Sequence, residues 1–107
     1  EYVPGPVSVK EEEKPEPYPA ACNYPNPFNA STTIRFSIPR QEKVTVTVYN
    51  IYGQKVKDLV TGTFPAGTNH VIWDSTTEKG IHAASGLYFY RIKAGNISTA
   101  GKMLLMR

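Results

Sequence analysis

The chain has 107 residues, of which 40% are hydrophobic and 20% charged, and its formal net charge is +3. This length accommodates one domain with a modest core, and it excludes a deep, elaborate active site. No apolar run approaches the roughly 20 residues of a membrane-spanning helix. The single cysteine, Cys22, excludes an internal disulfide framework and a multi-cysteine metal site. It is either a lone thiol without a role or a point of contact with another chain.

Residues 1–22 are predicted to form an extended, acidic and proline-rich tail or linker. Residues 1–24 carry two lysines against five glutamates, whereas residues 25–107 carry ten basic against four acidic side chains. Opposite charges favour contact between tail and domain, within one chain or between neighbours. The alternative interpretation is that these charges serve only to keep the protein soluble. Because the sequence starts without a methionine or a leader, we expect it to be processed or cut from a longer protein.

The domain is predicted over residues 23–107, and its first stretch is NYPNPFNAS, residues 23–31. Prolines fix φ near about −65° and disfavour helix at the residue before them. Asparagines bond back to the nearby backbone and hold bends. We therefore expect this stretch to be the first structured element of the domain, with Phe28 filling one end of the sandwich.

From residue 32 onward, short runs of alternating apolar and polar residues are separated by turn residues. Alternation with period two is typical of strands that bury one face. Turns are predicted at Gly53, at residues 65–67 and at residues 95–96, and a brief strand at residues 81–83. The expected inward side chains are Ile34, Phe36, Ile38, Val44, Val46, Val48, Val71, Trp73, Tyr88, Tyr90 and Ile92. Six or seven such strands predict an all-β sandwich.

The sequence closes on KMLLMR, which contains four consecutive apolar residues. If Met103 and Leu105 face the core, Leu104 and Met106 face outward. A strand with one solvated face does not normally place two large apolar side chains on that face. The two side chains therefore form an outward contact surface, or a loop or the tail covers them.

Candidate catalytic and ligand-binding residues are few. His70 is expected on the solvent side of a strand, and Asp74, which follows Trp73, is expected to cap loop backbone. Ser31 and Ser85 have no histidine at a recognisable spacing. Since the sequence also lacks metal-binding and phosphate-binding motifs, neither an enzyme nor a cofactor is predicted. Basic residues are scattered singly and aromatic residues lie on expected core faces, so nucleic acid is not a predicted partner.

Six segments carry a family resemblance, in the order in which that family has them. They are YPNPFN, TTIRFSIP, VTVTVYNIYGQKV, LVTGTFPAGTNHVIWD, SGLYFYRIKAG and KMLLMR, and together they run through residues 24–107. The chain resembles the type A C-terminal sorting domains of the type IX secretion system and the related immunoglobulin-like domain of flagellar hook-capping proteins. The resemblance implies an immunoglobulin-like antiparallel β-sandwich of seven strands.

The resemblance also implies delivery rather than catalysis. Such a domain guides a cargo protein through the periplasm and across the outer membrane of a Gram-negative bacterium, so the protein is expected to be secreted or held at the cell surface. The implied partner is the secretion machinery at the outer membrane, and the domain is commonly removed on arrival. The residues implied in recognition are Tyr24, Pro25, Asn26, Pro27, Gly86, Tyr88, Lys102, Met103, Leu104, Leu105, Met106 and Arg107.

One departure from the family pattern suggests an alternative, because no foldable cargo precedes the domain in this sequence. The alternative is a self-assembling subunit of an extracellular filament, in which the tail of one copy adds as a strand to the sandwich of the next. A head-to-tail contact of this kind need not close, so it yields filaments. Pro4 and Pro6 restrict the pairing. The candidate donor-strand residues are Tyr2, Val3, Val7 and Val9.

Overall fold

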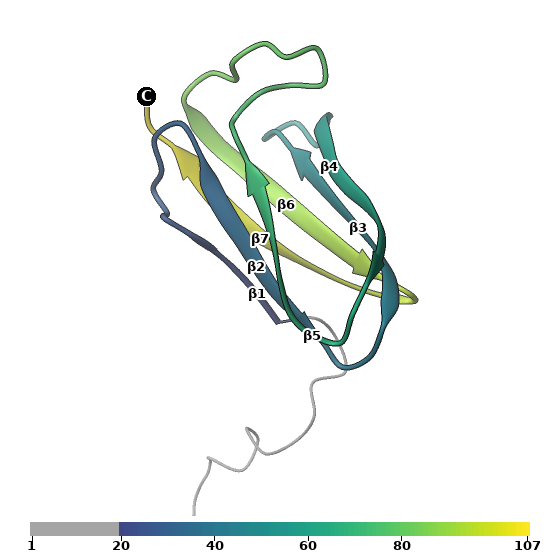
Figure 1. Ribbon diagram of the computed structural model, residues 1–107. Helices are drawn as coiled ribbons and strands as arrows, with labels where there is room; N and C mark the ends of the chain where they lie inside the picture. Colours follow the sequence, from purple (N-terminus) through teal and green to yellow (C-terminus); the bar gives the residue numbers. More distant parts are fainter. Residues whose placement is uncertain (1–19) are drawn as a thin grey trace, which may run out of the picture.

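The computed structural model describes residues 20–107, which fold into two antiparallel β-sheets packed face to face (Figure 1). The strands are β1 Ala20–Tyr24, β2 Thr32–Ile38, β3 Glu42–Tyr49, β4 Lys55–Phe64, β5 Gly67–Trp73, β6 Gly86–Ala94 and β7 Ile97–Leu105. One sheet has the order β1–β2–β5 and the other β4–β3–β6–β7. The predicted seven-stranded sandwich is confirmed. None of the described residues belongs to a helix with the length and apolar character needed to cross a membrane.

Alternation along the strands decides which side chains enter the space between the sheets. In β3 the side chains of Val44, Val46 and Val48 are fully buried, because β-branched residues at every second position fill the inner face of a pleated sheet. Trp73 is also fully buried, and its ring meets that of Tyr88 edge to face, with the ring centroids 5.2 Å apart. The predicted inward residues are confirmed as core, apart from Val71 of β5, which is only partly buried against it.

Strand register places the loops at two distinct ends of the sandwich. The hairpin end holds the β2–β3 and β4–β5 connections and the β6–β7 turn, because Ile38 pairs with Gly67 and Val44 with Ala94. The start of β1 lies at this end as well, since Ala20 pairs with Ser37. The loop end holds residues 25–31, 50–54 and 74–85. The two ends therefore differ in character, with short turns at one and long connections at the other.

Two details differ from the sequence-based expectation. Strand β1 begins at Ala20, so residues 20–22, which the sequence pattern placed in the tail, pair with Arg35 to Ser37 of β2. These residues have no alternating pattern, and only the backbone of β2 makes them a strand. The brief strand expected at residues 81–83 is a single bridge between Thr76 and His82. The expectations for Tyr2, Val3, Val7 and Val9 lie outside the described residues.

Candidate recognition surface

The loop between β1 and β2 is fastened to the core by Phe28. Its side chain is 2% exposed, and its ring packs against that of Trp73 with centroids 5.7 Å apart at an angle of 59°. The Trp73 indole nitrogen donates to the carbonyl oxygen of Thr76 at 3.0 Å, which fixes the ring on which Phe28 rests. The prediction that Phe28 fills one end of the sandwich is confirmed. The peptide bonds before Pro25 and Pro27 are both cis.

The same loop is joined to the last residues of β7. The Asn26 side-chain nitrogen donates to the Lys102 carbonyl oxygen at 3.1 Å, and the Leu104 backbone nitrogen donates to the Asn26 side-chain oxygen at 3.0 Å. Phe28 continues the contact, because its backbone nitrogen donates to the Leu104 carbonyl at 2.9 Å and its carbonyl accepts from Met106 at 2.8 Å. The loop thus satisfies backbone groups that an edge strand otherwise exposes, and it covers this part of β7 against further pairing.

Arg107 fastens the same region to the loop between β5 and β6. Its Nε donates to the Ala83 carbonyl at 2.7 Å, and one terminal nitrogen donates to the Ser75 hydroxyl oxygen at 2.7 Å. Ser75 is fully buried and has a positive φ of 63°. Its hydroxyl also donates to the Ala30 carbonyl at 2.8 Å, so three loop segments meet at one serine. Sequence reasoning missed Ser75, because nothing local marks a serine as the partner of a side chain 32 residues away.

The residues implied in recognition divide into buried and exposed groups. Tyr88, Met103 and Leu105 are buried, so they affect recognition only by holding the scaffold, and Gly86 is half-buried. Leu104 is 38% exposed and Met106 54% exposed. The exposed group comprises Tyr24, Pro25, Asn26, Pro27, Lys102, Leu104, Met106 and Arg107. Within residues 20–107 nothing covers Leu104 and Met106, as the outward-surface reading of KMLLMR requires.

Leu87 belongs with this exposed group although it was not predicted. It pairs with Leu104 across β6 and β7, and it is 37% exposed. The alternation that turns Tyr88 inward also turns Leu87 outward, so the sequence contained the information needed. We call the set Pro25, Asn26, Pro27, Leu87, Leu104 and Met106 the terminal patch.

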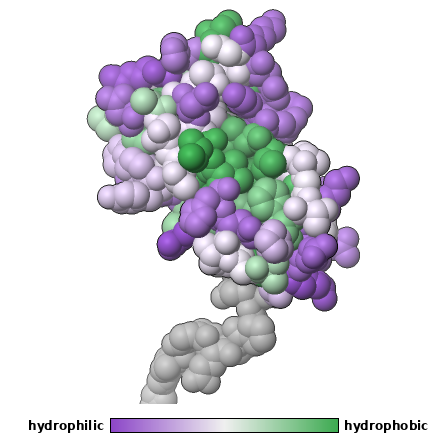
Figure 2. All heavy atoms as spheres, viewed as in Figure 1, coloured by the Kyte–Doolittle hydropathy of each residue, from purple (hydrophilic) through white to green (hydrophobic). Residues whose placement is uncertain are grey.

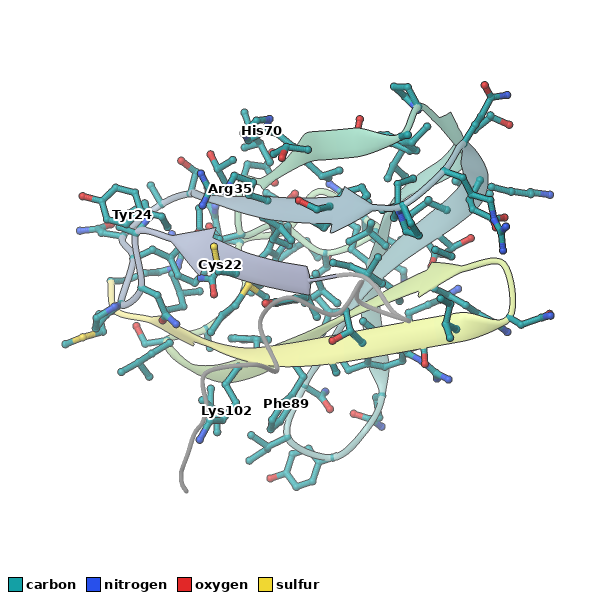
Figure 3. The ribbon with its side chains drawn as sticks, turned by 90° about the horizontal axis from the view of Figure 1, so that it is seen from below. Cys22, Tyr24, Arg35, His70, Phe89 and Lys102 are labelled. Carbon is teal, nitrogen blue, oxygen red and sulfur yellow. The ribbon has the colours of Figure 1, made fainter. Side chains whose placement is uncertain are left out.

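Tyr24 does not join the terminal patch. It is 79% exposed and points from β1 to the outer face of the three-stranded sheet. There it lines a shallow pocket of about 440 Å³ together with Cys22, Arg35 and His70, which stand on adjacent strands (Figure 3). Phe89 and Lys102 lie on the other sheet in the same view. The structure therefore separates Tyr24 from Leu104, although the family resemblance groups them.

The pocket beside Tyr24 has few chemical possibilities. Cys22, Arg35 and His70 form one cross-strand row, and the Cys22 thiol and His70 ring are both exposed, as was predicted for His70. No group of three or more metal-ligating side chains occurs among the described residues. The row offers a thiol and two basic groups without a carboxylate, so it lacks the acidic partner that orients a catalytic histidine.

Carboxylates elsewhere on the domain are held by local hydrogen bonds. Asp58 receives bonds from Lys55 Nζ at 2.8 Å and from the Thr47 hydroxyl at 2.9 Å, and these lower the pKa of Asp58. Hydrogen bonds from Thr76, through its hydroxyl at 2.6 Å and its backbone nitrogen at 3.2 Å, lower the pKa of Asp74. The prediction that Asp74 caps loop backbone is confirmed. Neither carboxylate has the raised pKa expected of a general acid.

The sequence model of the FlgD Ig-like domain matches residues 28–98. The chain belongs to the FlgD Ig-like domain family. The structure of this FlgD Ig-like domain also matches that of PorU of Porphyromonas gingivalis, which was solved as a dimeric latent protein. The TM-score is 0.69 and the sequence identity 24%, and the match covers 82% of this chain and 9% of PorU. It matches PorZ, a surface component of the type IX secretion system of the same organism, with a TM-score of 0.57 and 20% identity over 81% of this chain and 11% of PorZ.

These comparisons confirm the family resemblance drawn from the six sequence segments. The chain spans about a tenth of the length of PorU and of PorZ, and at 24% and 20% identity the likeness shows a shared fold. No curated protein matches the chain significantly in sequence.

Proposed function

We propose that this FlgD Ig-like domain is a non-enzymatic sorting module of the type IX secretion kind, recognised by a protein of the secretion machinery at the outer membrane. The observation that carries the proposal is the terminal patch. Here the YPNPFN stretch and the closing KMLLMR stretch, 76 residues apart at Asn26 and Lys102, are joined by hydrogen bonds into one surface. The likeness in fold between this domain and PorZ supports the same proposal.

The physical character of the terminal patch suits recognition by another protein. Leu87, Leu104 and Met106 present apolar side chains to solvent on backbone that is held by β6, β7 and the Phe28 anchor. Exposed apolar side chains on a rigid frame bind a partner at a low cost in conformational entropy. In this proposal the protein is exported through the periplasm and acts outside the cell or on its surface.

The test places the full chain behind a reporter protein in a Gram-negative bacterium that has a type IX system. Surface delivery is measured as access of external protease to the reporter. We expect the unaltered fusion to reach the surface and the double variant Leu104→Ser, Met106→Ser to stay in the periplasm. Ile72→Ser is the matched control, because Ile72 is 65% exposed on the outer face of the other sheet. Equal delivery of both variants, or retention of the unaltered fusion, contradicts the proposal.

A second candidate function is the self-assembling filament subunit, and one observation favours it. Both β4 and β5 are edge strands, and the apolar side chains gather on the face where these two strands lie (Figure 2). Ile72 of β5 is exposed as well, on the outer face of its sheet. The partly buried apolar residues of the two strands are Val56, Leu59, Val60, Phe64 and Val71. An added strand from a neighbour would pair with an open edge and cover such side chains.

Electron microscopy and light scattering of the full chain, beside a version without residues 1–10, test the filament. Long assemblies that disappear on truncation support it, and monomers in both samples contradict it. A finer comparison replaces Val7 and Val9 by serine, with Ser8→Ala as the matched control, because only the valines share one face of an extended segment.

A further inference from the structure

We propose that residues 7–13, with the sequence VSVKEEE, dock in the same chain on a groove along the outer face of the four-stranded sheet. The groove adjoins the terminal patch on the outer face of β6, where Leu87 precedes Phe89 by two residues, and it is separate from the open edge between β4 and β5. The proposal does not depend on sorting, so either can fail without the other.

The groove consists of two adjoining hollows on β3 and β6. One hollow, of about 290 Å³, is lined by Thr45, Thr47, Tyr49, Arg91 and Lys93. The other, of about 390 Å³, is lined by Tyr49, Asn50, Ile51, Gly53, Phe89, Tyr90, Arg91 and Ala100. They share Tyr49 and Arg91, so they form one path along the strands. The path has a basic half toward the hairpin end and an apolar half toward the loop end.

The basic half lacks a compensating negative charge. Arg91 and Lys93 point outward and are exposed, and neither forms an ion pair in the part of the chain that the structure describes. Lys43, on the same face of β3, is exposed as well. Two carboxylates lie near this half, and both are already bonded: Asp58, opposite Thr47, to Lys55 and Thr47, and Glu42, beside Lys43, to Arg40. Three successive glutamates, at residues 11–13, supply the complementary charge.

The apolar half matches the residues that precede the glutamates. Phe89 stands opposite Tyr49, and Ile51 beside them is 59% exposed. Phe89 precedes Arg91 by two residues, as Val9 precedes Glu11, and both segments would be extended. With Glu11 on Arg91 and Glu13 on Lys93, Val9 therefore falls over Phe89 and Val7 lies beside Leu87.

The chain is long enough to reach the groove in the required direction. Strand β1 lies beside β7 at one edge of the sandwich, and Ala20 is at the hairpin end, where the basic half begins. Sheets stand about 10 Å apart and strands about 4.8 Å apart, so the path round β7 to Arg91 is about 20 Å. From Glu13 to Ala20 the chain makes seven residue steps through the sequence KPEPYP, and these span about 22 Å as extended proline-rich chain at about 3.1 Å per residue. The glutamates thus arrive at the basic half first.

A paramagnetic label near the valines tests the docking in the full chain. The label is placed at Ser8→Cys in a Cys22→Ser background, and loss of amide NMR intensity is measured along the strands. We expect the largest loss at Tyr49, Phe89 and Arg91. The loss should not change on about tenfold dilution, because the contact is intramolecular. It should fall sharply at about 1 M salt, where the Debye length is about 3 Å.

Charge variants supply the matched comparison. Arg91→Glu with Lys93→Glu should abolish the loss of intensity, whereas Lys79→Glu, an exposed lysine in the β5–β6 loop, should preserve it. The salt measurement needs no variant and so stands even if the double charge reversal disturbs folding. The proposal is overturned if amide intensities are equally strong along all the strands. It is also overturned if the loss of intensity falls on β4 and β5 instead, or if the loss grows with protein concentration. The last two results point to addition of the tail to a neighbour.

Discussion

Replacing Phe28 by alanine should remove much of the stability of the domain. Its ring is 2% exposed and rests on Trp73, so truncation leaves a cavity at the loop end that the sheets cannot close. A Phe-to-Ala change at such a site costs about 3–5 kcal/mol. A small domain has a free energy of unfolding of about 0.05–0.15 kcal/mol per residue, so this is a large part of the total. The midpoint of thermal unfolding should fall by about 12 °C or more.

The assay is thermal and urea unfolding followed by circular dichroism. Phe28→Leu should lose less, because it keeps most of the buried volume, and it remains measurable if the alanine variant is unfolded. Tyr24→Ala is the matched control, because Tyr24 is an aromatic residue of the same segment that is 79% exposed. It should change the free energy of unfolding by no more than about 0.5 kcal/mol. If Phe28→Ala behaves like Tyr24→Ala, the loop is a simple linker and the reasoning is wrong.

Three further predictions concern the strands and loops. Gly101→Ala should lower the free energy of unfolding by about 1–3 kcal/mol, because the added Cβ would lie 2.6 Å from Cε2 of Tyr90. Gly62→Ala is the control and should cause no such loss in urea unfolding, because an added Cβ there meets nothing within 4 Å. Asp74→Ala should cost about 0.5–1.5 kcal/mol at neutral pH by removing the acceptor for Thr76. Because the pKa of Asp74 is lowered in the folded state, this difference should shrink as the pH falls through that pKa and the carboxylate loses its charge; an undiminished difference in acid contradicts the assignment. Burial, with a smaller effect of the Cys22 charge, raises the pKa of Tyr90 in the folded state. The urea midpoint of the unaltered protein should therefore decline as the pH rises above about 10, where the unfolded state loses this proton first. An equal decline of the urea midpoint in Tyr90→Phe contradicts this prediction.

The inward and outward faces of the strands could be predicted from the sequence. In β3, Val44, Val46 and Val48 alternate with polar residues, and a period of two has only one arrangement that buries all three. Phe28 was likewise predictable, because a large apolar residue directly after two proline bends has few places to go except the core. Strand β1 was not predictable, since residues 20–22 become a strand only through pairing with β2.

The candidate site was only partly predictable. The resemblance named Asn26 and Leu104, but their contact depends on a side-chain amide meeting a backbone 78 residues away. It also grouped Tyr24 with Leu104, which point from different sheets. Which sheet a strand joins depends on its pairing partner, and this is not encoded in the strand itself.

The sequence by itself determined the six strands β2 to β7 with their faces and turns, and the charge separation between tail and domain, because these follow from local composition and period. Six ordered segments of the sequence also pointed to the family. The tertiary structure alone decided that Asn26 completes the edge of β7, that Arg107 bonds to the buried Ser75, and that Arg91 shares a groove with Tyr49. These contacts join residues far apart in the chain. A hydrogen bond or a groove depends on the relative positions of whole strands, which are set only when both sheets pack around one core.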